Sequence, residues 1–321
     1  MEWNPWPGEV GWRFSPLVLA RLLWRLLCNI TNQIEILCLL RDPAFRPLLR
    51  VHPLFFVKYL KRSFLVDDFS VDQHAECFLH HYRKLRSTFS GQCLRSLFYD
   101  DVALHTWCQG ECNYRITMGL SRPFDWEGEM SIHFQMDGIS VYVLSFTIVP
   151  GSFVHSQAHE VLLISRVQGL RDCLTQIRQS TRILHDLGLP ALLFAALQGF
   201  GEGCGIGECA GVSALQQVSN CGPLHHQFVK AYDDFFTELG AAQNAGGFFV
   251  VHLPSAEKPL NQMKSGNRSR RKKQRFLKAE VAGAALQVTC ANLREKSSYI
   301  TEPAFRTEPS AAALGMQFPA L

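Results

Sequence analysis

Hydrophobic positions along the chain predict helices first and a sheet afterwards. Apolar residues recur at helical spacing over residues 15–64 and again over 71–90. Apolar and polar residues then alternate over 129–136, and the next two residues, Asp137-Gly138, are a strong signal for a two-residue hairpin turn. β-Branched and aromatic residues fill 139–149. We therefore predict that 129–136 and 139–149 form a β-hairpin.

Strands and helices alternate in the second half of the chain. The predicted elements are a strand over 159–167, a helix over 172–186, a helical run over 191–197, a Gly-rich connecting loop over 199–211, a short strand over 215–218, an amphipathic helix over 228–239 and a last strand over 248–253. This order predicts an α+β fold class, in which N-terminal helices join a mixed, mostly antiparallel sheet flanked by helices.

Three parts of the chain differ in pattern. We predict a helical N-terminal part (1–100), an α+β core (101–280) and a poorly ordered, Ala-rich tail (281–321).

Charge is concentrated in one place. The whole chain has a formal net charge of +4, yet the run 264–278 contains eight basic residues and no acidic one. This run predicts an anionic partner or a solvated helix face. Its anion-binding candidates are Arg270, Arg271, Lys272, Lys273 and Arg275. Phe276 is the only aromatic residue in the run, so the run offers little surface for stacking on nucleic-acid bases. Nucleic acid is therefore not the expected partner.

The eleven cysteines follow no disulfide framework, and their spacing does not match a usual zinc ribbon, so we expect reduced thiols, no metal and a cytoplasmic protein. No window reaches the ~18 uncharged apolar residues that a membrane span needs. The segment Ser15–Cys28 has an apolar stripe beside Trp24 and two arginines. Such a helix packs on the domain core or lies on a membrane surface, and we favour the core.

A strand followed by a helix forms the most distinctive candidate site. The predicted strand ends in Arg166-Val-Gln-Gly-Leu-Arg171, and a helix follows. The start of a helix presents free backbone N–H groups and a positive dipole end, which suit a phosphate. A plain strand-to-helix turn is the alternative. Gly205-x-Gly207-x-x-Ala210 formally fits a dinucleotide fingerprint, but it follows a helical run and not a strand. Glu127 and Glu129 would share one face of an extended strand, where paired carboxylates can perform acid–base chemistry or remain solvated.

Several segments together resemble the VirK/YbjX-like family of Gram-negative bacterial proteins. The matching segments are His80-His81-Tyr82, Glu127 to Ile132, Val141 to Phe146, Val167-Gln-Gly169, Thr181 to His185, Val218-Ser-Asn220, Tyr232 to Gly240, Phe249 to Pro254 and the basic run. The resemblance covers residues 40–278. It implies a role in virulence, envelope stress or resistance to antimicrobial peptides, and no established catalytic residue.

A second resemblance concerns the fold. The order of strand, Arg166-x-x-Gly169, helix, strand and Tyr232 is similar to the core of the GCN5-related N-acyltransferases. In those enzymes the loop cradles the coenzyme A pyrophosphate and a tyrosine protonates the leaving thiolate. The second glycine of that loop is absent here. The resemblance implies that Gln168, Gly169 and Arg171 bind the pyrophosphate of an acyl-coenzyme A donor. Our cofactor-binding candidates also include Arg166 and Asn220. Our catalytic candidates are Tyr232, Glu129 and His185.

Two functions follow from these observations. The first is a cytoplasmic envelope-stress protein that transfers an acyl or aminoacyl group. The second is a non-enzymatic adaptor, peripheral at the inner membrane, that binds anionic lipid through the basic run and the N-terminal stripe.

Overall fold

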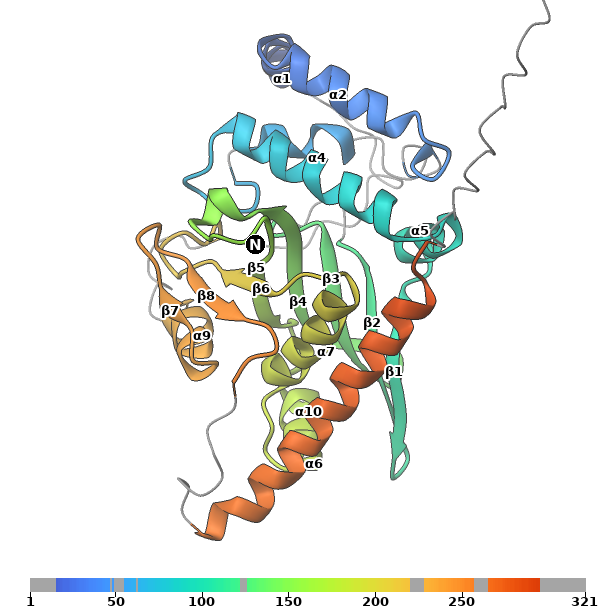
Figure 1. The fold of residues 1–321 in the computed structure, drawn as a ribbon, viewed down its shortest axis with the longest axis vertical. Helices are drawn as coiled ribbons and strands as arrows, with labels where there is room; N and C mark the ends of the chain where they lie inside the picture. The colour runs from blue at the N-terminus through green and yellow to red at the C-terminus, as the bar shows by residue number, and fades with distance from the viewer. Residues whose placement is uncertain are drawn as a thin grey trace, which may run out of the picture.

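The computed structural model describes residues 16–46, 48, 55–61, 63–121, 126–219, 228–256 and 265–294. The fold is α+β, as predicted: helices flank one mixed sheet of eight strands (Figure 1). The helices are α1 (Pro16–Cys28), α2 (Ile30–Leu40), η1 (Phe55–Leu60), α4 (Val71–Thr88), α5 (Gly91–Tyr99), η2 (Gly151–Val154), α6 (Leu174–Ile183), α7 (Leu189–Gly203), η4 (Val229–Asp233), α9 (Asp234–Glu238) and α10 (Ser265–Ala291).

The sheet has the strand order β1-β2-β3-β4-β5-β6-β8-β7. The strands are β1 (Val102–Gln109), β2 (Cys112–Leu120), β3 (Met130–Met136), β4 (Ile139–Pro150), β5 (Glu160–Gly169), β6 (Glu208–Gly211), β7 (Ala242–Gln243) and β8 (Phe249–His252). Neighbouring strands run antiparallel except β5 and β6, which run parallel. Strands β3 and β4 confirm the hairpin predicted around Asp137-Gly138.

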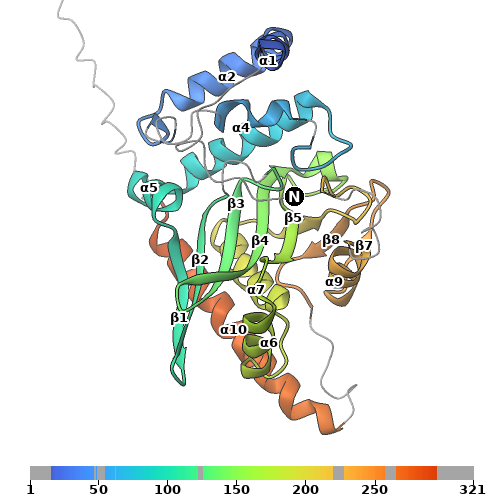
Figure 2. The same ribbon diagram turned by 180° about the vertical axis from the view of Figure 1, so that it is seen from behind.

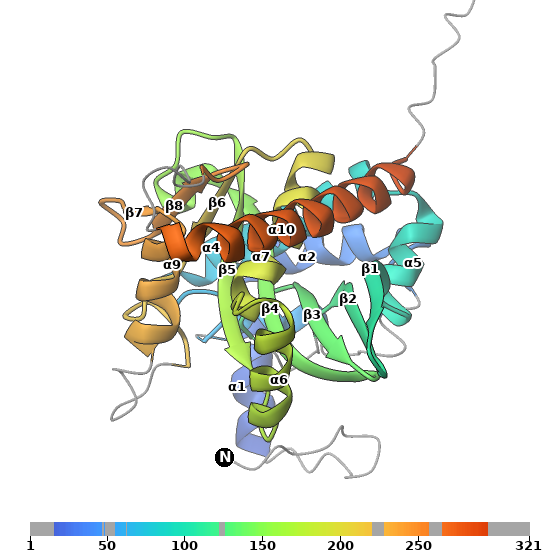
Figure 3. The same ribbon diagram turned by 90° about the horizontal axis from the view of Figure 1, so that it is seen from below.

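The two faces of the sheet differ in chemistry. Along β3, the buried apolar residues Met130, Ile132 and Phe134 alternate with the polar residues Ser131, His133 and Gln135, because successive side chains of a strand point to opposite faces. Helices α6, α7 and α10 lie on one face, where the ring of Phe146 packs on Phe200 of α7. Seen from behind, the sheet lies in front of α7 and α10 (Figure 2). The view from below shows α10 running across α7 (Figure 3).

The Gly-rich stretch is not the connecting loop we predicted. Helix α7 continues to Gly203, and residues 208–211 form β6. A Cβ atom on Gly199 would lie 2.1 Å from the carbonyl oxygen of Ala282 in α10, and one on Gly203 would lie 2.6 Å from the methyl group of Thr289. These two glycines are four residues apart on one face of α7 and allow α10 to pack closely. The strand predicted over 215–218 is also wrong, since a turn occupies residues 214–216.

Helix α10 extends the ordered chain beyond the boundary we predicted at 281. It continues to Ala291, and its residues Val281 and Ala285 are buried. An isolated bridge between Phe89 and Leu293 then joins the chain to the helical N-terminal part. Residues 295–321 of the predicted tail lie outside the described residues.

The N-terminal helix differs from the core helix that we favoured. Of the predicted stripe, Leu26 packs against the core, whereas Leu23 and Leu27 are exposed. Trp24 is 67% exposed. Among the described side chains of α1, Leu23, Trp24 and Leu27 are therefore open to solvent.

Candidate functional site

The candidate site lies where the parallel strands β5 and β6 separate. Their pairing begins at Leu162–Cys209 and ends at Ile164–Gly211. Beyond this point β5 continues to Gly169, while β6 ends. Side chains from other elements bind the backbone groups of β5 that β6 leaves unpaired, since buried backbone groups need partners.

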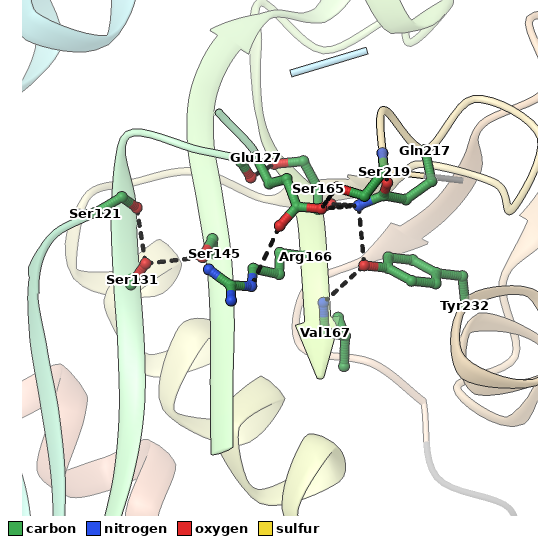
Figure 4. A network of polar contacts seen from close by, with 10 residues as sticks. All are labelled: Ser121, Glu127, Ser131, Ser145, Ser165, Arg166, Val167, Gln217, Ser219 and Tyr232. Atoms are coloured by element: carbon green, nitrogen blue, oxygen red, sulfur yellow. Dashed lines mark hydrogen bonds and ion pairs between the residues drawn. The ribbon is translucent and has the colours of Figure 1, made fainter. Parts of the chain in front are cut away.

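Glu127 is at the centre of these contacts (Figure 4). Its carboxylate accepts hydrogen bonds from Gln217 Nε2 and Ser219 Oγ, each at 2.6 Å, and lies 3.3 Å from Arg166 Nε. The hydroxyl of Ser165 donates to its backbone carbonyl. Glu127 and Arg166 are both nearly buried, so each side chain has lost most of its hydration. The ion pair and the hydrogen bonds to Glu127 compensate for that loss.

Tyr232 projects from η4 toward the same point. Its hydroxyl oxygen accepts a hydrogen bond from Gln217 Nε2 at 3.1 Å and a longer one from the backbone N–H of Val167 at 3.4 Å. Burial, followed by the negative charge of Glu127, raises the pKa of Tyr232 well above its ordinary value. The phenol therefore keeps its proton at neutral pH. Tyr232 is 1% exposed, and within the described part of the chain both hydrogen bonds to its oxygen come from donors, so neither uses the phenol's own proton.

A row of serines crosses the sheet toward Arg166. The hydroxyls of Ser121 and Ser131 are 2.7 Å apart, and those of Ser131 and Ser145 are 2.8 Å apart. Ser145 pairs with Arg166 across β4 and β5, and Figure 4 shows it beside the guanidinium group. Because a hydroxyl both donates and accepts, this row is a continuous hydrogen-bonded chain.

Arg166 also binds Gln168. The hydrogen-bond network favours the amide orientation in which the Gln168 oxygen accepts from Arg166 Nε at 2.8 Å and Nη2 at 2.6 Å. Two of the sequence-predicted cofactor residues therefore contact each other.

The loop after β5 leads directly into α6. Gly169 ends the strand, Arg171 is exposed, and Asp172 has a positive φ of 63°. The N-cap residue of α6, Cys173, makes no side-chain cap hydrogen bond, and the first turn has no acidic residue. The first N–H groups of this ten-residue helix follow Arg171 and Asp172 in the sequence, and the first turn itself has no acidic residue.

Glu129 belongs to a different cluster from Glu127. Its carboxylate lies 3.0 Å from Lys58 Nζ and accepts a hydrogen bond from the Tyr82 hydroxyl. All three side chains are almost completely buried. The two carboxylates therefore bind different partners and do not form the acid–base pair that we considered. Burial, and then the charge of Glu129, raise the pKa of Tyr82 well above its ordinary value.

The other predicted residues lie elsewhere. His185 follows the end of α6, has a positive φ of 57°, and accepts a hydrogen bond at its carbonyl from Gln274 of α10. Within the described residues, no hydrogen bond or ion pair joins it to Tyr232. Asn220 lies outside the described residues.

The basic run forms the first half of α10. Arg271, Lys272 and Lys273 are exposed, and Arg275 is half-buried. Arg270 forms an ion pair with Asp186 at 3.0 Å.

Sequence reasoning missed Gln217, Ser219 and the serine row as site residues. Gln217 is only 2% exposed, but an amide in a predicted strand gives no sequence signal for a buried binding role. The signal that the chain did offer was the series of serines at positions 131, 145 and 165 inside otherwise apolar strands.

No helix in the described residues is long and apolar enough to cross a membrane. Comparison with curated proteins finds no match, and neither does comparison with solved structures. The sequence model of one family, described as a protein of unknown function (DUF535), matches residues 18–283. This match spans well over half of the chain, and the chain therefore belongs to the DUF535 family.

Proposed function

We propose that this protein transfers an acyl group from an acyl-coenzyme A or a related donor to a nucleophilic acceptor. The observation that carries the proposal is the protonated Tyr232 hydroxyl at the separation of β5 and β6, whose oxygen accepts from two donors that do not use its own proton. A thioester transfer needs such a proton donor, because the departing thiolate must be neutralised.

The loop after β5 suits the phosphate end of such a donor. Arg171 would provide charge, and the N–H groups at the start of α6 would provide hydrogen bonds. Arg166 and Gln168 would hold the end of β5 in place beneath it.

The edge of β5 suits an extended, amide-containing arm of the acyl donor. The N–H of Val167 and the carbonyl of Ser165 are bound by the side chains of Tyr232 and Gln217 at 3.4 and 3.1 Å. A ligand amide that lies along β5 would take over these contacts, and Tyr232 and Gln217 would turn toward it.

The proposed transfer exchanges the thioester bond of the donor for a bond to the acceptor. An amine or hydroxyl of the acceptor attacks the thioester carbonyl, a new carbon–nitrogen or carbon–oxygen bond forms, and the carbon–sulfur bond breaks. Tyr232 gives its proton to the departing sulfur, and the proton that the acceptor loses restores the phenol. Gln217 and Glu127 orient the tyrosine.

Binding is tested by thermal unfolding with a panel of acyl-coenzyme A species. A ligand at a hundred times its Kd stabilises the folded state by ~2.7 kcal/mol, which raises Tm by a few degrees. Arg171→Glu should raise the ligand concentration needed for the same shift by about tenfold or more. The matched control is Arg178→Glu, an equal charge change at an exposed position within α6, which should leave the shift unchanged. No shift with any member of the panel would overturn the proposal.

Chemistry is tested by following release of free coenzyme A chromatographically in the presence of candidate amine and hydroxyl acceptors. Tyr232→Phe should keep the thermal shift and slow the release about 10²–10⁴-fold, the usual contribution of a proton donor. Equal rates for the variant and the wild type would remove Tyr232 from this role.

We further propose that the activity serves envelope stress, virulence or resistance to antimicrobial peptides, as the resemblance to VirK/YbjX-like proteins implies. The ten described cysteines are free thiols, which supports our expectation of a cytoplasmic location. A second candidate function is an adaptor that binds anionic lipid through the basic run. The exposure of Arg271, Lys272 and Lys273 favours it, and the vesicle experiment below tests it.

A further inference from the structure

The helices α1 and α2 form a layer at one end of the molecule, which we call the cap. Figure 1 shows them at the top of the longest axis, with α1 seen end-on and α2 running across the picture. Figure 2 shows the same arrangement from behind, and Figure 3 shows α1 lengthwise. The two helices therefore meet at an angle and both lie across the end of the molecule.

The inner side of the cap is fixed to the body. In α2 the buried residues are Gln33, Ile36, Leu39 and Leu40. Arg25 of α1 donates to the carbonyl oxygen of Leu60 in η1 at 3.0 Å. Because these contacts hold the inner side, the opposite side of each helix faces away from the protein.

That outer side is apolar. Six large side chains on it are between 46 and 67% exposed: Leu23, Trp24, Leu27, Ile30, Ile34 and Leu37. They account for half of the large hydrophobic residues that are exposed in the described chain. Six large exposed apolar side chains on two adjoining helices are typical of an interaction surface.

The charges around this surface are positive. The two acidic residues of the described stretch 16–46 are already paired with arginines of α4, Glu35 with Arg83 at 2.8 Å and Asp42 with Arg86 at 2.6 Å. Arg41 and Arg46 are exposed on the same stretch. An anionic partner is therefore favoured over a neutral or basic one.

We propose that the outer side of the cap docks on the surface of an anionic lipid bilayer. Two helices at an angle present a broad surface, which suits a plane. A tryptophan beside arginines is typical of the boundary between headgroups and acyl chains, and Trp3, Trp6 and Trp12 precede Trp24 in the sequence. At 1.5 Å per residue α1 extends only roughly 20 Å, so it lies on a bilayer and does not cross it.

This surface is distinct from the basic run. The first half of α10 lies at the bottom of Figure 1, at the other end of the longest axis. One flat membrane cannot contact both ends, so the adaptor that we considered, which uses the two together, is inconsistent with this arrangement. The proposal does not depend on acyl transfer.

The test is flotation of the full chain with vesicles of phosphatidylcholine and phosphatidylglycerol, and with vesicles of phosphatidylcholine alone. We expect binding to the anionic vesicles, and Leu23→Gln/Leu27→Gln should weaken it about tenfold or more. The matched control is Ile139→Gln/Leu215→Gln, which replaces two other exposed apolar residues, both outside the cap and outside the basic run, and should bind like the wild type. Circular dichroism verifies that both variants fold.

Three outcomes would overturn the proposal. The first is absence of binding to anionic vesicles. The second is unchanged binding by Leu23→Gln/Leu27→Gln together with loss of binding when Arg270, Arg271, Lys272 and Lys273 are replaced by Glu, which would assign the contact to the basic run. The third is a wild-type dimer in sedimentation that the Leu23→Gln/Leu27→Gln variant converts to a monomer without vesicle binding, which would assign the surface to a second copy.

Discussion

Lys58 and Glu129 form an ion pair from which water is almost fully excluded. Their side chains are 1% and 0% exposed, and Lys58 also donates to the carbonyl of Gly128 at 2.9 Å. A buried ion pair contributes little net stability relative to a well-packed apolar pair, but removal of one partner leaves an uncompensated charge. We therefore assign Glu129 to connecting η1 and α4 with the start of β3, and not to catalysis.

Lys58→Met should lower the free energy of unfolding by about 3–5 kcal/mol, because Glu129 would remain buried without its cation. Urea denaturation measures this change. Lys58→Met/Glu129→Gln is the control, since it removes both charges and should regain much of the loss. A single variant as stable as the wild type would contradict the assignment.

Residue roles were less predictable than residue positions. The sequence places Arg166, Gln168 and Gly169 at the end of a strand before a helix, and the structure agrees. Glu129 and Tyr232 are both buried among hydrogen-bond partners, but only the partners reveal that Glu129 neutralises a lysine. Those partners lie about 50 to 70 residues away in the sequence, at Tyr82 and Lys58, so no local pattern contains them.

At the scale of elements, the glycines of α7 have a packing role. Both Gly199 and Gly203 face α10, and a side chain on either would meet atoms of that helix. Glycine weakens a helix by about 1 kcal/mol relative to alanine, so an isolated sequence pattern favours a loop here. Contact with a helix some eighty residues later in the sequence offsets that preference, and this is why the predicted loop is wrong.

Gly199→Ala should destabilise the protein by about 1–3 kcal/mol, as overpacking usually does. The new methyl group would lie 2.1 Å from a backbone oxygen that can move only with α10. Gly207→Ala is the matched control, because its Cβ would meet nothing within 4 Å. Thermal unfolding compares the two variants; equal Tm values would argue against close packing of α7 on α10.

At the scale of the whole molecule, the helical N-terminal part and the sheet share one core. The buried apolar cluster includes Ile36 of α2, Phe146 of β4 and Ala285 of α10. The fold class and the β3–β4 hairpin could be predicted from the sequence because alternation and turn residues are local signals. The continuous core and the role of α10 in it could not, because they depend on contacts between distant segments.

A shared core predicts one cooperative unfolding transition. Far-ultraviolet circular dichroism follows the helices, and tryptophan fluorescence includes Trp107 on the sheet. The two denaturation curves should coincide, as in two-state unfolding. Two separated midpoints would instead indicate that residues 1–100 unfold as an independent domain.

The position of α10 has a consequence for synthesis. Its buried residues complete the surface that α7 presents, yet they leave the ribosome long after α7 does. At ~5–20 residues per second, the nascent chain exposes the glycine-lined side of α7 for several seconds before α10 arrives. During that interval the exposed side of α7 is suited to binding by ribosome-associated chaperones, and the core can be completed only after α10 has emerged.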